Sequence, residues 1–215
     1  MNEDINVFFT AESNERVKIG DYYYIDGTFS HIYQKTIKCI GIVFCTKNIL
    51  FGEGQPSHGS VVALEDANDG GNNFLHIWRK GIDKVDNLSL RSKNRQIGFI
   101  RKILVEDYGG LFYTKNLFDV DYEAVNAARN FSINIPDGKT SGWYLPSSGQ
   151  MWQIANRFFH NDEFVVQKSL LNLADKYIVS QPKEIICPLC LDLKEREFSY
   201  GNTDERFLVR PVFSF

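Results

Sequence analysis

Short apolar stretches rich in aromatic and β-branched residues, separated by turn residues, predict β-strands in the first part of the chain. Lys18–Ile25 leads into Asp26-Gly27, a dipeptide that tolerates the positive φ of a tight turn, and Thr28–Ser30 follows. This pattern predicts a β-hairpin. β-Branched residues predict further strands at Thr36–Phe44 and Ser60–Leu64. The N-terminal part of the chain is therefore expected to be rich in strands.

The next stretch gives no regular pattern. Asp66–Asn73 contains Asp-Gly-Gly-Asn-Asn and is expected to be a loop. From Phe74 to Val105 the apolar residues are spaced irregularly, so no element is assigned there.

Helical spacing in the middle of the chain predicts three helices. The first covers Asp121–Phe131. Ser147 precedes Gln150 by three residues, which is the spacing of a capping box and predicts the start of the second helix. The third is expected over Asp162–Ala174. The apolar stripes consist of Val120, Ala124, Ala127, Ala128 and Phe131 in the first helix, Met151, Ile154, Ala155 and Phe158 in the second, and Phe164, Val165, Leu170, Leu171 and Leu173 in the third.

Strand-like stretches return after the helices, at residues 177–180, 184–193, 198–200 and 207–215. Strands at both ends with helices between them predict the α+β class. No internal repeat and no Pro- or Ser-rich linker divides the chain. Residues 17–215 are therefore expected to form a single domain, preceded by an N-terminal extension at residues 1–16.

Composition and charge narrow the classes of function. Of 215 residues, 43% are apolar and 24% are charged, which is typical of a globular domain with its own core. The net charge of -3 would repel a polyanion, so nucleic-acid binding is not expected. No apolar run reaches the ~18 residues of a membrane-spanning helix, and Met1–Asn14 does not resemble a signal peptide. Aromatic residues make up 14% of the chain, which suits either a strand-rich core or a ligand-stacking surface.

Four cysteines raise the question of a metal or redox site. Cys187 and Cys190 have the spacing of a zinc clip, but Cys39 and Cys45 lie on an expected strand with their thiols about 20 Å apart. The Cys187–Cys190 stretch does not open a helix after a strand, as a thioredoxin-like redox motif would. Buried free thiols are the favoured interpretation. We expect no cofactor, and neither zinc nor calcium is favoured.

Four segments, taken in order, are recognisable together: Val17–Ser30, Ile40–Phe44 with His58–Ala67, Gly142–Gln150, and Val209–Phe215. They resemble a bacterial C-type-lectin-like module of the Bacteroidetes type, the major paralogous domain of the formylglycine-generating-enzyme-like fold superfamily. The resemblance spans about residues 17–215. It implies a C-type-lectin-like fold with a small mixed or antiparallel sheet, two to three helices, long loops, and terminal strands that pair near Asp21 and Val209.

The sequence departs from this resemblance near its C-terminal strands. The tryptophans common there are absent from Tyr177–Glu184 and from the strand that follows. Gln181-Pro182 is similar to the start of the Gln-Pro-Asp triplet of calcium-dependent galactose-type lectins, but Lys183 replaces the aspartate. Because calcium needs several converging oxygen ligands, calcium-dependent sugar binding is not favoured. The C-terminal surface is therefore divergent.

No catalytic motif is evident. The four histidines are scattered, and the chain has neither a phosphate-binding loop nor Gly-x-Ser-x-Gly. Formylglycine-generating enzymes work through paired cysteines, but Cys187 and Cys190 do not match that family's arrangement. Catalysis is therefore the minority interpretation.

A family-like scaffold with a divergent polar segment leads to the hypothesis of a non-catalytic ligand-binding or adhesion module of a bacterial or phage surface protein. The ligand would be a protein or a glycan at a surface. Lys194–Arg206 mixes charged, amide and aromatic groups suited to specific contact, although an exposed, solvated hairpin would give the same pattern. The candidate contact residues are Gln181, Lys194, Arg196, Tyr200, Asn202, Asp204 and Arg206.

Two other functions remain open. The chain would serve as a structural subunit or tip domain of a larger surface assembly, such as a fimbria or tail fibre, or as a formylglycine-generating-type oxidase. The resemblance implies an extracellular location as part of an exported protein. Since Met1–Asn14 gives no signal peptide, we expect either an excised domain or a protein made without one, as phage structural proteins are. The oligomeric state stays open.

Overall fold

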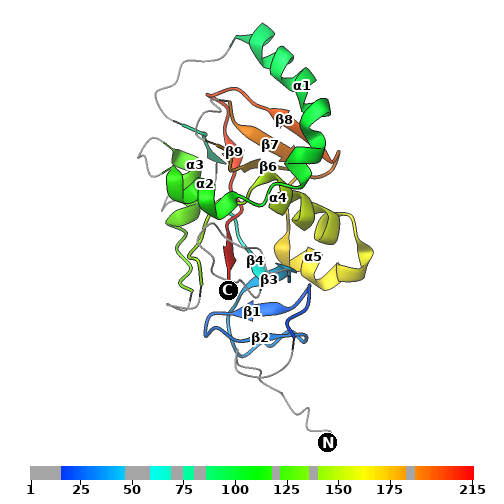
Figure 1. The fold of residues 1–215 in the computed structure, drawn as a ribbon. Helices are drawn as coiled ribbons and strands as arrows, with labels where there is room; N and C mark the ends of the chain where they lie inside the picture. The colour runs from blue at the N-terminus through cyan, green and yellow to red at the C-terminus, as the bar shows by residue number, and fades with distance from the viewer. Residues whose placement is uncertain are drawn as a thin grey trace, which may run out of the picture.

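The computed structural model describes residues 16–46, 59–68, 75–79, 86–117, 122–135, 140–182 and 187–215. Two five-stranded sheets and a set of short helices make up these ranges, so the predicted α+β class is confirmed (Figure 1). The two sheets take the place of the single small sheet expected from the resemblance. Most of the N-terminal extension and most of the Asp66–Asn73 loop lie outside the described residues.

The first sheet is antiparallel and contains the predicted hairpin. Its strand order is β10-β4-β3-β1-β2. Gly27 takes a φ of +86° in the turn, a conformation that glycine adopts without steric cost. The predicted strands at 36–44 and 60–64 are confirmed with shifted ends. The strands are β1 Tyr22–Tyr24, β2 Phe29–Ser30, β3 Cys39–Cys45, β4 Ser60–Ala63 and β10 Val212–Ser214.

The terminal strands do not pair with each other. The C-terminal strand β10 pairs with β4, where Phe213 lies opposite Val61. Strand β1 has no free edge, because β2 occupies one side and β3 the other. The hairpin therefore excludes the expected pairing, and the two terminal strands meet only through side chains, with the ring centroids of Tyr23 and Phe213 5.0 Å apart.

The second sheet has the order β5-β9-β6-β7-β8 and is mixed, because β6 and β9 run parallel. All four predicted C-terminal strand stretches contribute to it, the last of them only in part. The stretch predicted at 207–215 is divided, because its first part joins this sheet and its last part joins the other. The strands are β5 Leu75–His76, β6 Lys176–Val179, β7 Leu189–Asp192, β8 Glu197–Tyr200 and β9 Phe207–Leu208.

All three predicted helices are confirmed. The capping box is present, and the side-chain oxygen of Gln150 accepts a hydrogen bond of 3.0 Å from the backbone N–H of Ser147. Val165, predicted to face inward, is exposed, so that assignment is wrong. Two further helices, α1 and α2, were not predicted. The helices are α1 Asn87–Val105, α2 Gly110–Asn116, α3 Glu123–Arg129, α4 Ser148–Ile154, the π-helical η1 Ala155–Phe159, the 3-10 helix η2 Asp162–Phe164 and α5 Val165–Leu171.

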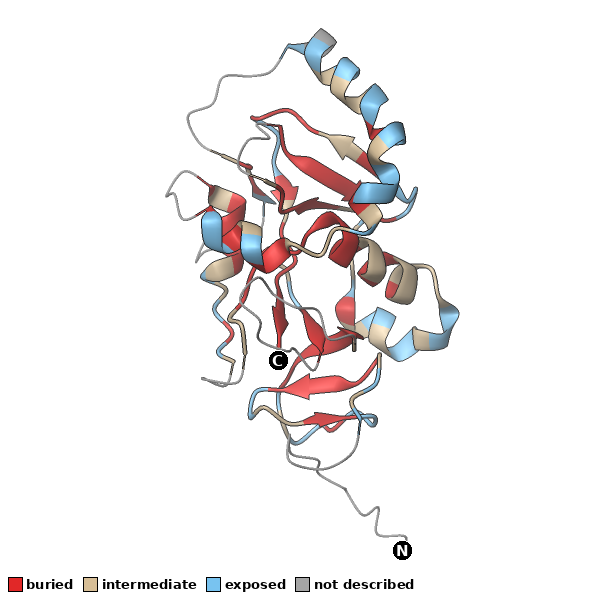
Figure 2. Ribbon diagram, viewed as in Figure 1, coloured by how far each residue is buried: buried red, intermediate tan, exposed pale blue. Residues whose placement is uncertain are grey.

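Buried residues concentrate in the sheets and in the helix faces turned toward them (Figure 2). Aromatic side chains supply much of this core, including the fully buried Tyr24, Phe44 and Phe158. The aromatic excess of the sequence is therefore mostly scaffold. The side chains Tyr22, Tyr23, Trp143 and Phe213 are also buried, whereas Trp152 and Phe215 are half-buried.

A buried charge joins the two sheets. Arg210 lies between β9 and β10 and is 2% exposed. Its Nε atom is 2.7 Å from Oδ1 of Asp66, which follows β4. Its terminal nitrogens donate hydrogen bonds of 3.1 Å to the carbonyl oxygen of Ala63 and to the hydroxyl of Tyr177 on β6. One guanidinium therefore holds residues of both sheets.

Replacing Arg210 by Met should lower the free energy of unfolding by about 3–5 kcal/mol, because the Asp66 carboxylate is then buried without its cation. Urea titration followed by tryptophan fluorescence measures the loss. The double variant Asp66→Asn/Arg210→Met should recover part of it, since no unpaired charge is left in the interior. A single variant within about 0.5 kcal/mol of the natural protein would contradict this role of Arg210.

Stability should also depend on the protonation of Asp66. Burial raises the pKa of this carboxyl above its ordinary value of 3.8, against the opposing effects of Arg210 and Tyr177. The folded state therefore holds the proton more tightly than the unfolded state, and the free energy of unfolding falls as the pH rises through the raised pKa. In urea titrations between about pH 4 and 7, Asp66→Asn should show a smaller fall than the natural protein. Equal falls would contradict the raised pKa.

Candidate functional site

The seven candidate contact residues do not form one cluster. In the register of the second sheet, Asp192 pairs with Glu197 at the β7–β8 turn, and Leu189 pairs with Tyr200 at the opposite end. The seven residues divide between these two ends. Lys194, Arg196 and Arg206 lie at the turn end, whereas Gln181, Tyr200 and Asn202 lie toward the other, with Asp204 in the segment that connects them.

Two of the seven are in the interior. Gln181 is buried, and its side-chain amide donates a hydrogen bond of 2.6 Å to the carbonyl oxygen of Cys187. Asn202 is buried too, and its side-chain oxygen accepts from the backbone N–H of Thr203. Both side chains hold loops in place and do not reach the surface, so they are removed from the proposed contact surface. Lys183, which distinguishes this chain from the Gln-Pro-Asp triplet, lies outside the described residues.

Arg206 is half-exposed and serves a packing role at the other edge of the sheet. It donates hydrogen bonds to the carbonyl oxygen of Leu75 at 3.1 Å and to the carboxylate of Glu123 at 3.3 Å. The same carboxylate lies 3.5 Å from Nδ1 of the buried His76. These contacts join the start of β9 to β5 and to the first turn of α3. Arg206 is therefore already used by the protein's own structure.

Helix α1 covers the outer edge of β8, next to the remaining candidates. The side chain of Asn94 accepts a hydrogen bond of 2.7 Å from the backbone N–H of Tyr200 and donates one of 3.2 Å to its carbonyl oxygen. Arg101 donates to the carbonyl oxygen of Arg196 at 3.0 Å and lies over the ring of Trp152. The side chain of Asn94 thus satisfies the backbone N–H and carbonyl groups of Tyr200, as a neighbouring strand would.

The opposite side of α1 faces solvent. Phe99 is 89% exposed and Ile103 is 68% exposed, one helical turn apart. Helix α1 contains five basic residues and no acidic residue. The exposed side is drawn in pale blue in Figure 2. We call it the α1 outer face, and it consists of Arg91, Arg95, Phe99, Lys102 and Ile103, all of which are exposed.

The α1 outer face is a candidate contact surface that the sequence prediction missed. Within the described ranges no ion pair involves Arg91, Arg95 or Lys102. Two large apolar groups in water beside unpaired cations are an arrangement typical of a contact surface. A signal was present in the sequence, since five cations occur over 19 residues without one carboxylate.

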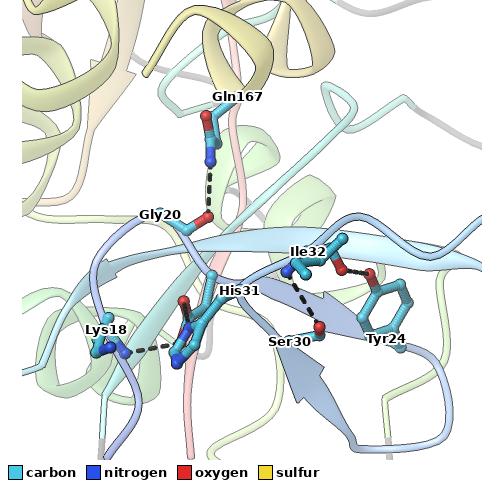
Figure 3. A network of polar contacts seen from close by, with 8 residues as sticks. Lys18, Gly20, Tyr24, Ser30, His31, Ile32 and Gln167 are labelled. Carbon is cyan, nitrogen blue, oxygen red and sulfur yellow. Dashed lines mark hydrogen bonds and ion pairs between the residues drawn. The ribbon is translucent and has the colours of Figure 1, made fainter. Parts of the chain in front are cut away.

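A second polar cluster lies at the N-terminal hairpin (Figure 3). His31 pairs through Nδ1 with the carboxylate of the buried Asp21, which also accepts a hydrogen bond of 2.7 Å from the backbone N–H of Lys18. Gln167 of α5 donates to the carbonyl oxygen of Gly20 at 3.0 Å. The Gln167 contact fastens the hairpin to α5, and the Asp21 contacts join residues within and just before the hairpin, so the cluster has a structural role.

The four cysteines are free and buried, as predicted. Burial raises the pKa of Cys39 to about 11 and raises the pKa of Cys190 further above its ordinary value. These thiols therefore stay protonated at neutral pH, a form that is a poor metal ligand and nucleophile. In the part of the chain that the structure describes, no three His, Cys, Asp or Glu side chains gather closely enough to hold a metal ion.

A scan against protein-family models, a search of curated proteins and a search of solved structures each found no match to this chain. The C-type-lectin-like resemblance therefore depends on the four sequence segments alone. None of the helices in the described ranges has the length and apolar character needed to cross a membrane.

Replacing Gly98 by Ala should raise the free energy of unfolding by about 0.5–1 kcal/mol. Gly98 lies inside α1, and a Cβ atom there would meet no heavy atom within 4 Å. Gly110→Ala is the matched control, because its Cβ would lie 2.3 Å from the side-chain oxygen of Gln150 and should destabilise the protein. Thermal unfolding measures both. A loss of stability in Gly98→Ala would contradict the solvent-facing position of this residue.

Proposed function

We propose that this protein is a non-catalytic ligand-binding or adhesion module of a bacterial or phage surface protein, and that its contact surface is the α1 outer face with the neighbouring β7–β8 turn. The observation that carries the proposal is the exposure of Phe99, 89%, on a helix with five cations and no carboxylate. The C-type-lectin-like resemblance supports a scaffold of this kind.

The chemistry of this surface favours an acidic ligand with an apolar part. Burying an exposed Phe side chain contributes about 1.5–3 kcal/mol. Arginines next to a large apolar side chain are common where a few residues dominate binding. Lys194 and Arg196, both exposed at the β7–β8 turn, extend the positive charge toward the neighbouring strand. The ligand would be an acidic protein surface or an acidic glycan.

The formylglycine-type alternative receives less support. Cys187 and Cys190 are both buried, and burial raises the pKa of each thiol. A thiol of this kind reacts slowly, because the thiolate is the reactive form. One observation favours the structural-subunit alternative. Residues 1–15 are acidic and α1 is basic, so copies of the chain carry segments of opposite charge.

Substitutions on the α1 outer face should weaken the binding of acidic probes. We expect Arg95→Glu and Phe99→Ser each to weaken binding about tenfold or more, through lost electrostatic attraction and lost apolar contact respectively. The probes are an array of sialylated, sulfated and neutral glycans and a polyglutamate-coated surface, read by fluorescence and interferometry.

Lys35→Glu is the matched control for this experiment, since Lys35 is exposed and lies between β2 and β3 of the first sheet, away from α1. It should bind as the natural protein does. Equal binding by the natural protein and Arg95→Glu would contradict the assignment of this surface, as would a preference for neutral glycans.

A further inference from the structure

The cations of the α1 outer face form no ion pair with another described residue. In the ion pairs that join two described residues, the carboxylates are those of Asp21, Asp66, Glu123 and Asp162, and none of the cations lies in α1. Arg91 and Arg95 are one turn apart, a like-charge spacing that costs an isolated helix about 0.2–0.5 kcal/mol. A bound acidic segment would relieve this repulsion.

The chain itself contains a segment of the complementary chemistry. Residues 1–15 hold four acidic residues, Glu3, Asp4, Glu12 and Glu15, and no lysine or arginine. They also hold an apolar run with Ile5, Val7, Phe8 and Phe9. The two sequences are thus opposite in charge, and each combines its charge with large apolar side chains. No other stretch of 15 residues in the chain is so acidic without a basic residue and so rich in phenylalanine.

The place where this segment joins the structure decides which copy it can reach. The described chain begins at Arg16, shortly before β1. Strands β1 and β2 lie at one end of the molecule and α1 lies at the other, with the second sheet and α4 between them (Figure 1). A segment that approaches α1 from a neighbouring copy would not have to span the molecule.

We propose that the α1 outer face binds the N-terminal segment, Met1–Glu15, of a second copy of this chain. The inference rests on the proposed function, because it names the ligand of the same contact surface. The surface and the segment are different parts of the chain, so the contact is heterologous, and repetition of it forms an open row of copies. The phenylalanines of the segment would cover Phe99 and Ile103, while its carboxylates lie near the arginines.

Charge reversal on each side provides the test, with the full-length chain throughout. The segment-reversed variant carries Glu3→Lys and Asp4→Lys, and the face-reversed variant carries Arg91→Glu and Arg95→Glu. A third chain combines all four substitutions. The control, Lys35→Glu with Lys38→Glu, makes the same charge change as the face-reversed variant at two exposed residues away from α1. Sedimentation velocity and light scattering measure the mass from about 1 to 100 μM at low salt.

The natural protein and the control should both rise about twofold or more above the 24.7 kDa of one chain as concentration increases. Each reversed variant should stay at the mass of one chain. An equimolar mixture of the two, and the chain with all four substitutions, should regain the higher mass, because opposite charges then meet again. This recovery separates a direct contact from damage to the fold.

Two results would overturn the inference. One is a natural protein that keeps the mass of a single chain at every concentration. The other is a failure of both the mixture and the combined variant to regain mass. If acidic probes still bind the natural protein and not the face-reversed variant in either case, the contact surface of the proposed function stands and only its occupant is wrong. If probe binding is also insensitive to the face reversal, the proposed function fails as well.

Discussion

The arrangement of the two sheets depends on the charge of Arg210 in the interior. A buried guanidinium is tolerated only where carboxylate and carbonyl or hydroxyl oxygens surround it. Asp66 and Ala63 approach it from the end of β4, and Tyr177 approaches it from β6. These partners belong to different sheets, so the requirement to satisfy one cation fixes how the sheets meet. The polypeptide passes from β9 to β10 at this same point.

Helix α1 lies along the edge of the second sheet, so one of its sides contacts the sheet and the other faces solvent. Strand β8 ends the second sheet, and Asn94 and Arg101 satisfy polar groups of its backbone and of its preceding turn. Because these polar contacts and the buried Ile97 hold the helix, Phe99 is not needed for packing. Phe99, the most exposed of the described large apolar residues, is thereby available for contact with a partner.

The features that sequence predicted correctly are determined by neighbours within a few residues. Asp26-Gly27 produces its turn, and Ser147 with Gln150 begins its helix, without help from distant parts of the chain. Helix α1 escaped prediction because its exposed apolar residues obscure the single apolar stripe that a helix normally shows. The pairing of β10 and the burial of Gln181 depend on which edges and spaces remain after other elements pack, and no local pattern contains that information.

The crossing between the sheets affects how the protein is made. Strands β9 and β10 both lie in the last nine residues of the sequence, and each completes a different sheet. During synthesis, β3 and β4 leave the ribosome well before β9 and β10, because more than 100 residues separate them. The backbone groups of β4 that later bond with β10 are then an unpaired edge, which favours association between nascent chains. The emergence of β9 and β10, rather than that of the earlier strands, therefore sets the time at which either sheet is completed.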